Sequence, residues 1–453
     1  MMSMTLLGVL GLLTLLVLLL LRMPVAISML TVGFVGTILA NANQFLLLGM
    51  ASDQAWARGW RVAFSNLSGE TFEAASNYNL LVIPMFVLMG SLAGVSGMSN
   101  DLFVAAYRWM GHLRGGLASA TIAACAGFAA LSGSSLASAV TMGRVALPEM
   151  KRYQYSDSLA TGSVAAGGTL GFLIPPSGGM IIYAVLTEQS IGRLFMAGII
   201  PGIILTLLFI AAINFTVARN PAAGPRGERA SSEDRRASLW NAAPILGVVL
   251  LTIGGMYTGF FTPVEASGVG AFFTFVVAFF RRSLSFETLK TVVSQTLNAT
   301  ATVFLIIIGA FVFIPFMSLT EVPAQAVTLL TSLPIGDLGV LLVIIGIYII
   351  LGMFLESMAM LVLTIPVVIP IAMGLNWDLI WFGIIVVIVL EMGMISPPVG
   401  INVFIVKSIA PDVPMGRIFS GIWPFWFAMA LMIALLILFP QIALFLPETV
   451  VGG

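Results

Sequence analysis

The chain has 453 residues, of which 59% are hydrophobic and only 8% charged, and its 19 basic and 19 acidic side chains give a net charge of +0 at pH 7. Soluble domains carry about 25% charged residues, so this composition cannot cover a water-facing surface and predicts an integral membrane protein. It provides no basic patch for nucleic acid, and one cysteine with one histidine excludes a disulfide framework, a Cys/His zinc site and a histidine-based catalytic pair.

Ten segments are apolar and long enough to cross a membrane as helices, which takes about 20 residues each. The first has no basic residues ahead of it and no small-residue cleavage site, so we treat it as a retained helix rather than a signal peptide. A long polar loop, 42–78, is predicted after the second segment. In chain order the segments are 4–21, 24–41, 79–97, 158–186, 195–218, 240–258, 263–280, 298–318, 378–406 and 420–446.

Two further apolar stretches, 115–150 and 338–373, are interrupted midway by small or polar residues. The interruptions are Ser132–Ser135 in the first stretch and Glu356–Ser357 in the second. Each half has roughly 15 residues, which is short for a full crossing. Each stretch therefore predicts a re-entrant hairpin whose tip lies inside the membrane.

Basic residues in short loops mark the cytoplasmic side of a membrane protein. They gather at Arg22, at 108–114, at 151–152, at 219–236, at 281–290 and at 407–417. If all of these face the cytoplasm, both chain ends lie outside and the two hairpins enter from opposite faces. Segment 219–238, rich in charge, Pro and Gly, predicts a cytoplasmic linker between residues 1–218 and 239–453.

The two parts of the chain repeat each other at an offset of 222 residues. Each part holds five predicted crossings, and an odd number inverts the second copy relative to the first. Inverted repeats with broken helices near the midplane are typical of secondary transporters, whereas a channel does not need two interrupted hairpins. The seven ungapped identities include three prolines and two glycines: Ser135/Ser357, Ala137/Ala359, Pro148/Pro370, Gly171/Gly393, Pro175/Pro397, Pro176/Pro398 and Gly178/Gly400.

The repeated Gly and Pro residues interrupt helices 158–186 and 378–406, because proline lacks an N–H donor and glycine lets the backbone turn. Carbonyl oxygens released at membrane depth need protein, water or a cation as a partner. Together with the hydroxyls of the hairpin tips they predict two Na⁺ sites, one in each repeat. The first comprises Ser132, Gly133, Ser134, Ser135, Ser138, Gly171, Ile174 and Pro176; the second comprises Gly352, Glu356, Ser357, Gly393, Ser396 and Val399.

The helices that restart after the proline pairs present N–H groups suited to a substrate carboxylate. The residues assigned to this substrate site are Ser177, Gly178, Pro398, Gly400 and Asn402. Glu356 and Glu391 lie inside predicted spans, where a charge is costly, and either can ligate the ion or carry a proton. The alternative for the whole region is that Gly and Pro only kink packed helices.

At these residues the sequence resembles the large membrane subunit (DctM type) of tripartite ATP-independent periplasmic, or TRAP, transporters. The resemblance implies an all-α fold like that of the ion transporter superfamily and an elevator mechanism in the bacterial inner membrane. It also implies a small four-helix membrane subunit (DctQ type), a periplasmic binding protein (DctP type) and small organic acids such as C4-dicarboxylates as substrates. The matching stretches are Pro84–Gly90, Ala130–Ser135, Gly167–Ser177, Thr187–Gly192, Gly254–Ala266 and Ser396–Asn402.

Two other functions are weighed against this one. The first is a Na⁺/carboxylate symporter of related fold that works without a binding protein. The second, a membrane-embedded hydrolase using a tip serine such as Ser134, lacks a second histidine or an intramembrane lysine to activate that serine. None of the three lysines follows a glycine, so there is no phosphate-binding loop for an ATP-driven pump. We expect no enzymatic activity and no cofactor other than Na⁺ as a coupling ion.

Overall fold

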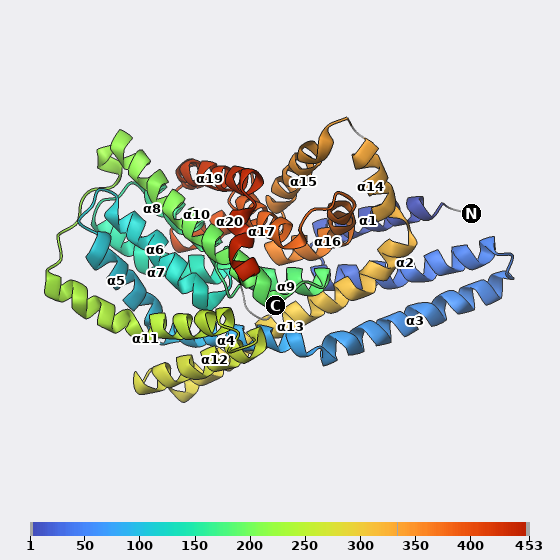
Figure 1. Ribbon diagram of the computed structural model, residues 1–453, viewed down its shortest axis with the longest axis horizontal. Helices are drawn as coiled ribbons and strands as arrows, with labels where there is room; N and C mark the ends of the chain where they lie inside the picture. The colour runs from blue at the N-terminus through green and yellow to red at the C-terminus, as the bar shows by residue number, and fades with distance from the viewer. Residues whose placement is uncertain (1–2, 333, 450–453) are drawn as a thin grey trace. The chain divides into compact units, whose positions relative to one another are not determined.

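The computed structural model describes residues 3–332 and 334–449, and all regular secondary structure in these ranges is helical (Figure 1). The first half contains α1 (Met4–Leu20), α2 (Val25–Leu47), α3 (Ser52–Ser76), the short η1 (Tyr78–Leu81), α4 (Val82–Val95), α5 (Met98–Met110), α6 (Gly116–Ser132), α7 (Ser135–Arg152), α8 (Asp157–Leu173), α9 (Gly178–Thr187) and α10 (Ile191–Arg219). The second half contains the short η2 (Pro221–Ala223), α11 (Ser232–Tyr257), α12 (Pro263–Phe280), α13 (Phe286–Leu319), α14 (Val322–Ser332), α15 (Gly336–Gly352), α16 (Ser357–Gly374), α17 (Leu379–Met394), α18 (Ile401–Ile409), α19 (Met415–Leu438) and α20 (Gln441–Thr449).

Within the described ranges, nine helical segments are long and apolar enough to cross a membrane. They comprise eight of the ten predicted spans together with Ser357–Gly374, which is one arm of the second hairpin. The other two predicted spans correspond to shorter apolar helices, α1 and α17. The prediction of an all-α polytopic membrane protein is confirmed.

The predicted hairpins and broken helices are present. The first hairpin is formed by α6 and α7, which meet at Gly133 and Ser134, and the second by α15 and α16. The two interrupted helices are α8 with α9 and α17 with α18. A proline pair lies in each interruption, and the peptide bond within each pair is cis.

The prediction of a loop over 42–78 is wrong, because most of it is helix α3. This helix runs antiparallel to α2 (Figure 1). It buries small residues, Ala55, Gly59 and Ala63, that recur every four positions. A Cβ atom on Gly59 would lie 2.8 Å from the carbonyl oxygen of Ile38 in α2. Such close approach of two backbones depends on small side chains rather than on apolar content, so hydropathy did not reveal the helix.

Two other sequence expectations are corrected, and a third is not tested. The predicted span 420–446 is two helices, since α19 ends at Leu438 and α20 begins at Gln441, next to Pro440. Helices α5 and α14 form in segments for which no helix was predicted. The predicted outside location of the two chain ends concerns residues 1–2 and 450–453, which lie outside the described ranges.

The chain divides into two compact units that are discontinuous in sequence. The first comprises residues up to Leu81, Asn298–Ile344 and Leu361–Leu379; the second comprises Val82–Leu297, Ile345–Met360 and the residues from Ile380 onward. The halves 1–218 and 239–453 that the repeat predicts are a different division, and they stay a prediction.

In the first unit, α13 packs on α1 and α2 through glycines. A Cβ atom on Gly11 or on Gly36 would lie within 2.6 Å of the Phe316 ring, so both helices approach this ring closely. A Cβ atom on Gly33 would lie 2.8 Å from the backbone of Phe313. Small residues at these positions let α13 lie directly against the two N-terminal helices.

In the second unit, α8 is the central helix. Every residue of α8 from Leu159 to Leu173 is buried, and α6, α7 and α19 pack against it. The approach of α19 is so close that a Cβ atom on Gly162 would lie 2.3 Å from the carbonyl oxygen of Gly421. Helix α8 thus positions the first hairpin and the last long helix around the first interruption.

The linker between the predicted repeats is mostly exposed but is anchored to the segments that flank the first hairpin. Three backbone hydrogen bonds do this: from Gly115 N to Gly224 O (2.9 Å), from Gly227 N to Gly111 O (2.9 Å) and from Ser156 N to Ala223 O (3.0 Å). The exposed ion pair of Lys151 with Asp412 (3.2 Å) connects this region to the segment after α18. Several of the basic segments that were predicted to be cytoplasmic therefore contact one another.

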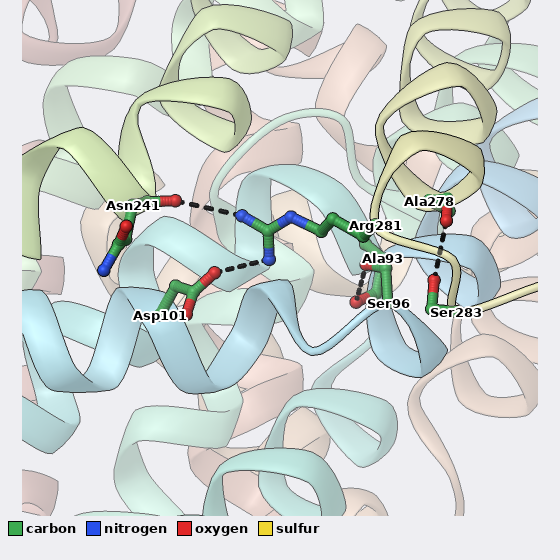
Figure 2. Close-up of polar contacts among 7 residues, drawn as sticks. All are labelled: Ala93, Ser96, Asp101, Asn241, Ala278, Arg281 and Ser283. Atoms are coloured by element: carbon green, nitrogen blue, oxygen red, sulfur yellow. Dashed lines mark hydrogen bonds and ion pairs between the residues drawn. The ribbon is translucent and has the colours of Figure 1, made fainter.

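A second ionic contact joins α5, α11 and α12. Figure 2 shows the guanidinium group of Arg281, at the end of α12, reaching Asp101 in α5 and donating to the carbonyl oxygen of Asn241 in α11 (3.0 Å). The Arg281 and Asp101 side chains are 27% and 23% exposed, so solvent screens this pair only in part. The contact links three helices that are distant in sequence.

The packing of α3 on α2 can be tested with two glycines of the same helix. Replacing Gly59 by Ala places a methyl group against the α2 backbone and should lower the free energy of unfolding by about 1–3 kcal/mol. Thermal unfolding followed by tryptophan fluorescence measures this, since Trp56 and Trp60 lie on α3.

Gly69→Ala is the matched control, because nothing lies within 4 Å of its Cβ position. It should leave stability unchanged or raise it slightly, since Ala favours helix over Gly by about 1 kcal/mol. Equal unfolding temperatures for the two variants would contradict the packing of α3 on α2.

Candidate functional site

All the residues that the sequence assigned to ion or substrate binding lie in the second unit. They come from the tips of the two hairpins and from the two helix interruptions. The structure brings each tip against the interruption of its own repeat. A third cluster, centred on Glu391, contacts residues from both tips.

The first tip packs on the end of α8 through Gly171. A Cβ atom there would lie 2.5 Å from the carbonyl oxygen of Ser134 and 2.7 Å from the hydroxyl of Ser138, so only glycine fits. The hydroxyls of Ser132 and Ser138 are 2.8 Å apart. Ile174 caps the end of α8, where the last carbonyls of a helix have no intrahelical partner. Hydroxyl and carbonyl oxygens are therefore concentrated at this tip.

The second tip packs on α17 through two glycines. A Cβ atom on Gly352, at the end of α15, would lie 2.9 Å from the Cα atom of Gly393. Ser396 donates to the carbonyl oxygen of Met392 (2.7 Å) and accepts from the indole of Trp426 (3.0 Å). Trp426, in α19, was not identified from the sequence, since no local pattern connects it to a residue 30 positions earlier.

The two repeats use the same hydrogen bond between tip and interruption. The amide of Gly178, two residues after the first proline pair, donates to the carbonyl oxygen of Gly133 (3.0 Å). The amide of Gly400, two residues after the second pair, donates to the carbonyl oxygen of Met353 (3.2 Å). Gly133 and Gly400 have positive φ angles of 59° and 63°, which glycine adopts readily.

These contacts bear on the predicted substrate site. The amides of Gly178 and Gly400 are engaged by the hairpins rather than free for a carboxylate. Ser177 is buried and caps α9, donating to Phe172 O while accepting from Met180 N (3.4 Å). The assignment of these residues to substrate stays a prediction.

Residues near the second proline pair differ in access. Pro398 is exposed and Val399 is half-buried, whereas Asn402 is fully buried. Of these three side chains, Pro398 is the exposed one.

Glu356 acts as a cap for α16, since its Oε2 accepts from the amides of Met358 (3.1 Å) and Ala359 (3.2 Å).

Glu391 in α17 is 1% exposed and is the centre of the third cluster. Its Oε1 accepts from the hydroxyl of Ser357 (2.8 Å). Ser135 from the first tip and Asn402 from α18 lie beside the same carboxyl group. The sequence had placed Ser135 and Ser357 in different ion sites, whereas the structure brings both to Glu391.

Comparison with known proteins gives a consistent result. The chain matches the family described as "Tripartite ATP-independent periplasmic transporter, DctM component" over residues 12–442. It is 35% identical to the C4-dicarboxylate TRAP transporter large permease protein DctM of Pseudomonas aeruginosa, over 84% of this chain and 89% of that protein. It is 30% identical to the sialic acid TRAP transporter large permease protein SiaM of Vibrio cholerae, over 95% of this chain and 96% of that protein.

Among solved structures, the fold is similar to that of the YdaH transporter of Alcanivorax borkumensis. The TM-score is 0.61 at 16% identity, covering 85% of this chain and 90% of that one. At this level of identity the likeness concerns the fold alone.

The contact between the second tip and α17 can be tested on α15. Gly352→Ala inserts a methyl group against Gly393 and should lower the free energy of unfolding by about 1–3 kcal/mol, read as a lower unfolding temperature in detergent. Gly346→Ala, on the same helix with nothing within 4 Å of its Cβ position, should not. If the two variants were equally stable, the close contact would be refuted.

Proposed function

Because this chain belongs to the DctM component family of tripartite ATP-independent periplasmic transporters, we propose that it is the large permease subunit of a Na⁺-coupled importer of a small organic acid. In this proposal a periplasmic binding protein delivers the substrate, and a small membrane subunit completes the assembly in the inner membrane. The family membership makes the chain a multi-pass membrane transporter subunit. The coupling ion, the substrate class and the mechanism are the proposal.

The observation that supports it best is the repeated contact between tip and interruption. In each repeat a glycine amide of the interruption bonds to the hairpin, and a glycine of the broken helix approaches the tip within van der Waals distance. Broken helices at membrane depth are tolerated where they line a cavity or hold an ion. Two such places, each rich in hydroxyl and carbonyl oxygens, suit two Na⁺ ions.

A carboxylate is the proposed substrate class. The relatives named above carry C4-dicarboxylate and sialic acid in their names, and both compounds are carboxylates. The interruptions offer helix N-termini, which favour negative charge. Within the described ranges, Lys, Arg and His side chains form no ion pair with a residue of either interruption, so backbone dipoles and Na⁺ would balance the substrate charge.

We further propose an elevator movement in which the two tips and their broken helices travel together. All the predicted site residues belong to one compact unit, as such a movement requires. Helices α1, α2 and α3, which belong to the first unit, are candidates for the fixed scaffold.

Reconstitution tests the proposed function. Proteoliposomes containing this chain and its small membrane subunit should take up a radiolabelled organic acid only with a Na⁺ gradient and a cognate binding protein. Uptake on a proton gradient alone would exclude Na⁺ coupling. Full uptake by this chain without either partner would instead favour a stand-alone symporter.

Gly171 links the first ion site to this function. Gly171→Ala displaces Ser134 and Ser138, so the Na⁺ concentration for half-maximal uptake should rise, by about tenfold if one oxygen ligand is lost at a cost near 1.4 kcal/mol. Gly254→Ala is the control, because nothing lies within 4 Å of its Cβ position. An unchanged Na⁺ dependence in Gly171→Ala would place the ion elsewhere.

A further inference from the structure

A buried polar cluster around Glu391 is left incomplete by the contacts of the protein itself. Oε2 of Glu391 is buried without a hydrogen-bond partner, and so are both polar atoms of the Asn402 side chain. Glu391 is 1% exposed and Asn402 is 0% exposed. Each polar atom left unpaired in a buried place loses the hydrogen bonds that water would give it, so a bound species that pairs with these atoms is favoured.

The charge of the cluster indicates what that species is. None of the ion pairs in the described part of the chain involves Glu391. The carboxyl group of Glu356 is close enough to add to the negative potential at Glu391. A buried carboxylate without a counter-charge is strongly disfavoured, and a cation beside Oε2 would remove the penalty.

The groups around the Glu391 carboxyl suit a hard cation. Asn402 has an amide oxygen, and Ser135 and Ser357 have hydroxyl oxygens. These groups come from four helices, α7, α16, α17 and α18, so their convergence is a product of the tertiary fold. Oxygen-only ligands with a single carboxylate match a small monovalent ion, whereas the described residues contain no group of three or more His, Cys, Asp or Glu suited to a heavier metal.

We propose that Glu391, Asn402, Ser135 and Ser357 form a third Na⁺ site between the two hairpin tips. It differs from the two sites proposed above because a carboxylate is its main ligand and because it joins serines from both repeats. With Ser135 assigned to the third site, the tip residues of the first Na⁺ site are Ser132, Gly133, Ser134 and Ser138. The second site keeps Gly352 and Ser396 beside the α17 interruption.

The site is single although the fold is repeated. At the offset of 222 residues, Thr169 occupies the position of Glu391 and Met180 that of Asn402. The Thr169 hydroxyl donates to the carbonyl oxygen of Ala166 (2.6 Å) in its own helix. The first repeat therefore has no carboxylate for an equivalent site.

Counting bound Na⁺ tests the site. The full chain in lipid nanodiscs is equilibrated with saturating radioactive Na⁺, with choline keeping the ionic strength constant. Glu391→Gln should bind one Na⁺ fewer per chain than the wild type, and Asn402→Ala should bind the ion more weakly or lose it. Thr169→Val, the counterpart position, should bind as many ions as the wild type.

Glu391→Asp is the control for misfolding. It keeps the carboxylate, so it should bind the full number of Na⁺ ions per chain, at a higher Na⁺ concentration. An unchanged count in Glu391→Gln would overturn the site and make Glu391 a neutral acid that glutamine can replace. Wild type that binds no Na⁺ would overturn it as well. The role of the site in transport rests on the proposed function, but the count does not. Failure of uptake in proteoliposomes can therefore be told apart from failure of this site.

Discussion

Two helices of this protein are interrupted inside segments that are otherwise apolar, and the polar groups released there must find partners within the protein. The chain meets this constraint in the same way twice. A glycine amide two residues after each proline pair donates to a hairpin carbonyl, at 3.0 Å in the first repeat and 3.2 Å in the second. The hairpins thus accept hydrogen bonds from backbone amides of the broken helices. The same bonds hold the hairpin tips in place.

Close backbone approach follows from this arrangement. Hydrogen bonds between a tip and an interruption need the two segments within a few ångströms of each other. At Gly171 and at the pair of Gly352 and Gly393, a single methyl group would occupy the space of a neighbouring backbone atom. The same use of glycine packs α8 against α19 and α13 against the N-terminal helices. In an apolar solvent, where burial drives helix association little, such contacts supply dispersion and fit.

The charged side chains differ in how far they are buried. Most of the charged side chains are exposed or half-buried, and several contact one another, as do Arg281 with Asp101 and Lys151 with Asp412. Glu391 is the exception, being a carboxyl group buried among hydroxyl and amide groups from four helices. An ionisable group buried in this way persists in membrane proteins mainly where it has a function.

Sequence alone determined the membrane class, both hairpins, both interrupted helices and the residues at their tips. These depend on local signals, namely apolar length, proline pairs and glycine, whose effects on the backbone need no tertiary contact. Sequence did not reveal α3, because its small residues act only against α2, nor the indole of Trp426 at Ser396, which lies 30 positions away. Only the tertiary structure decided that Ser135 and Ser357 meet at one carboxyl group and that the amides of Gly178 and Gly400 are engaged. Such pairings depend on how helices distant in sequence are placed in space. Periodicity along the chain does not predict that placement.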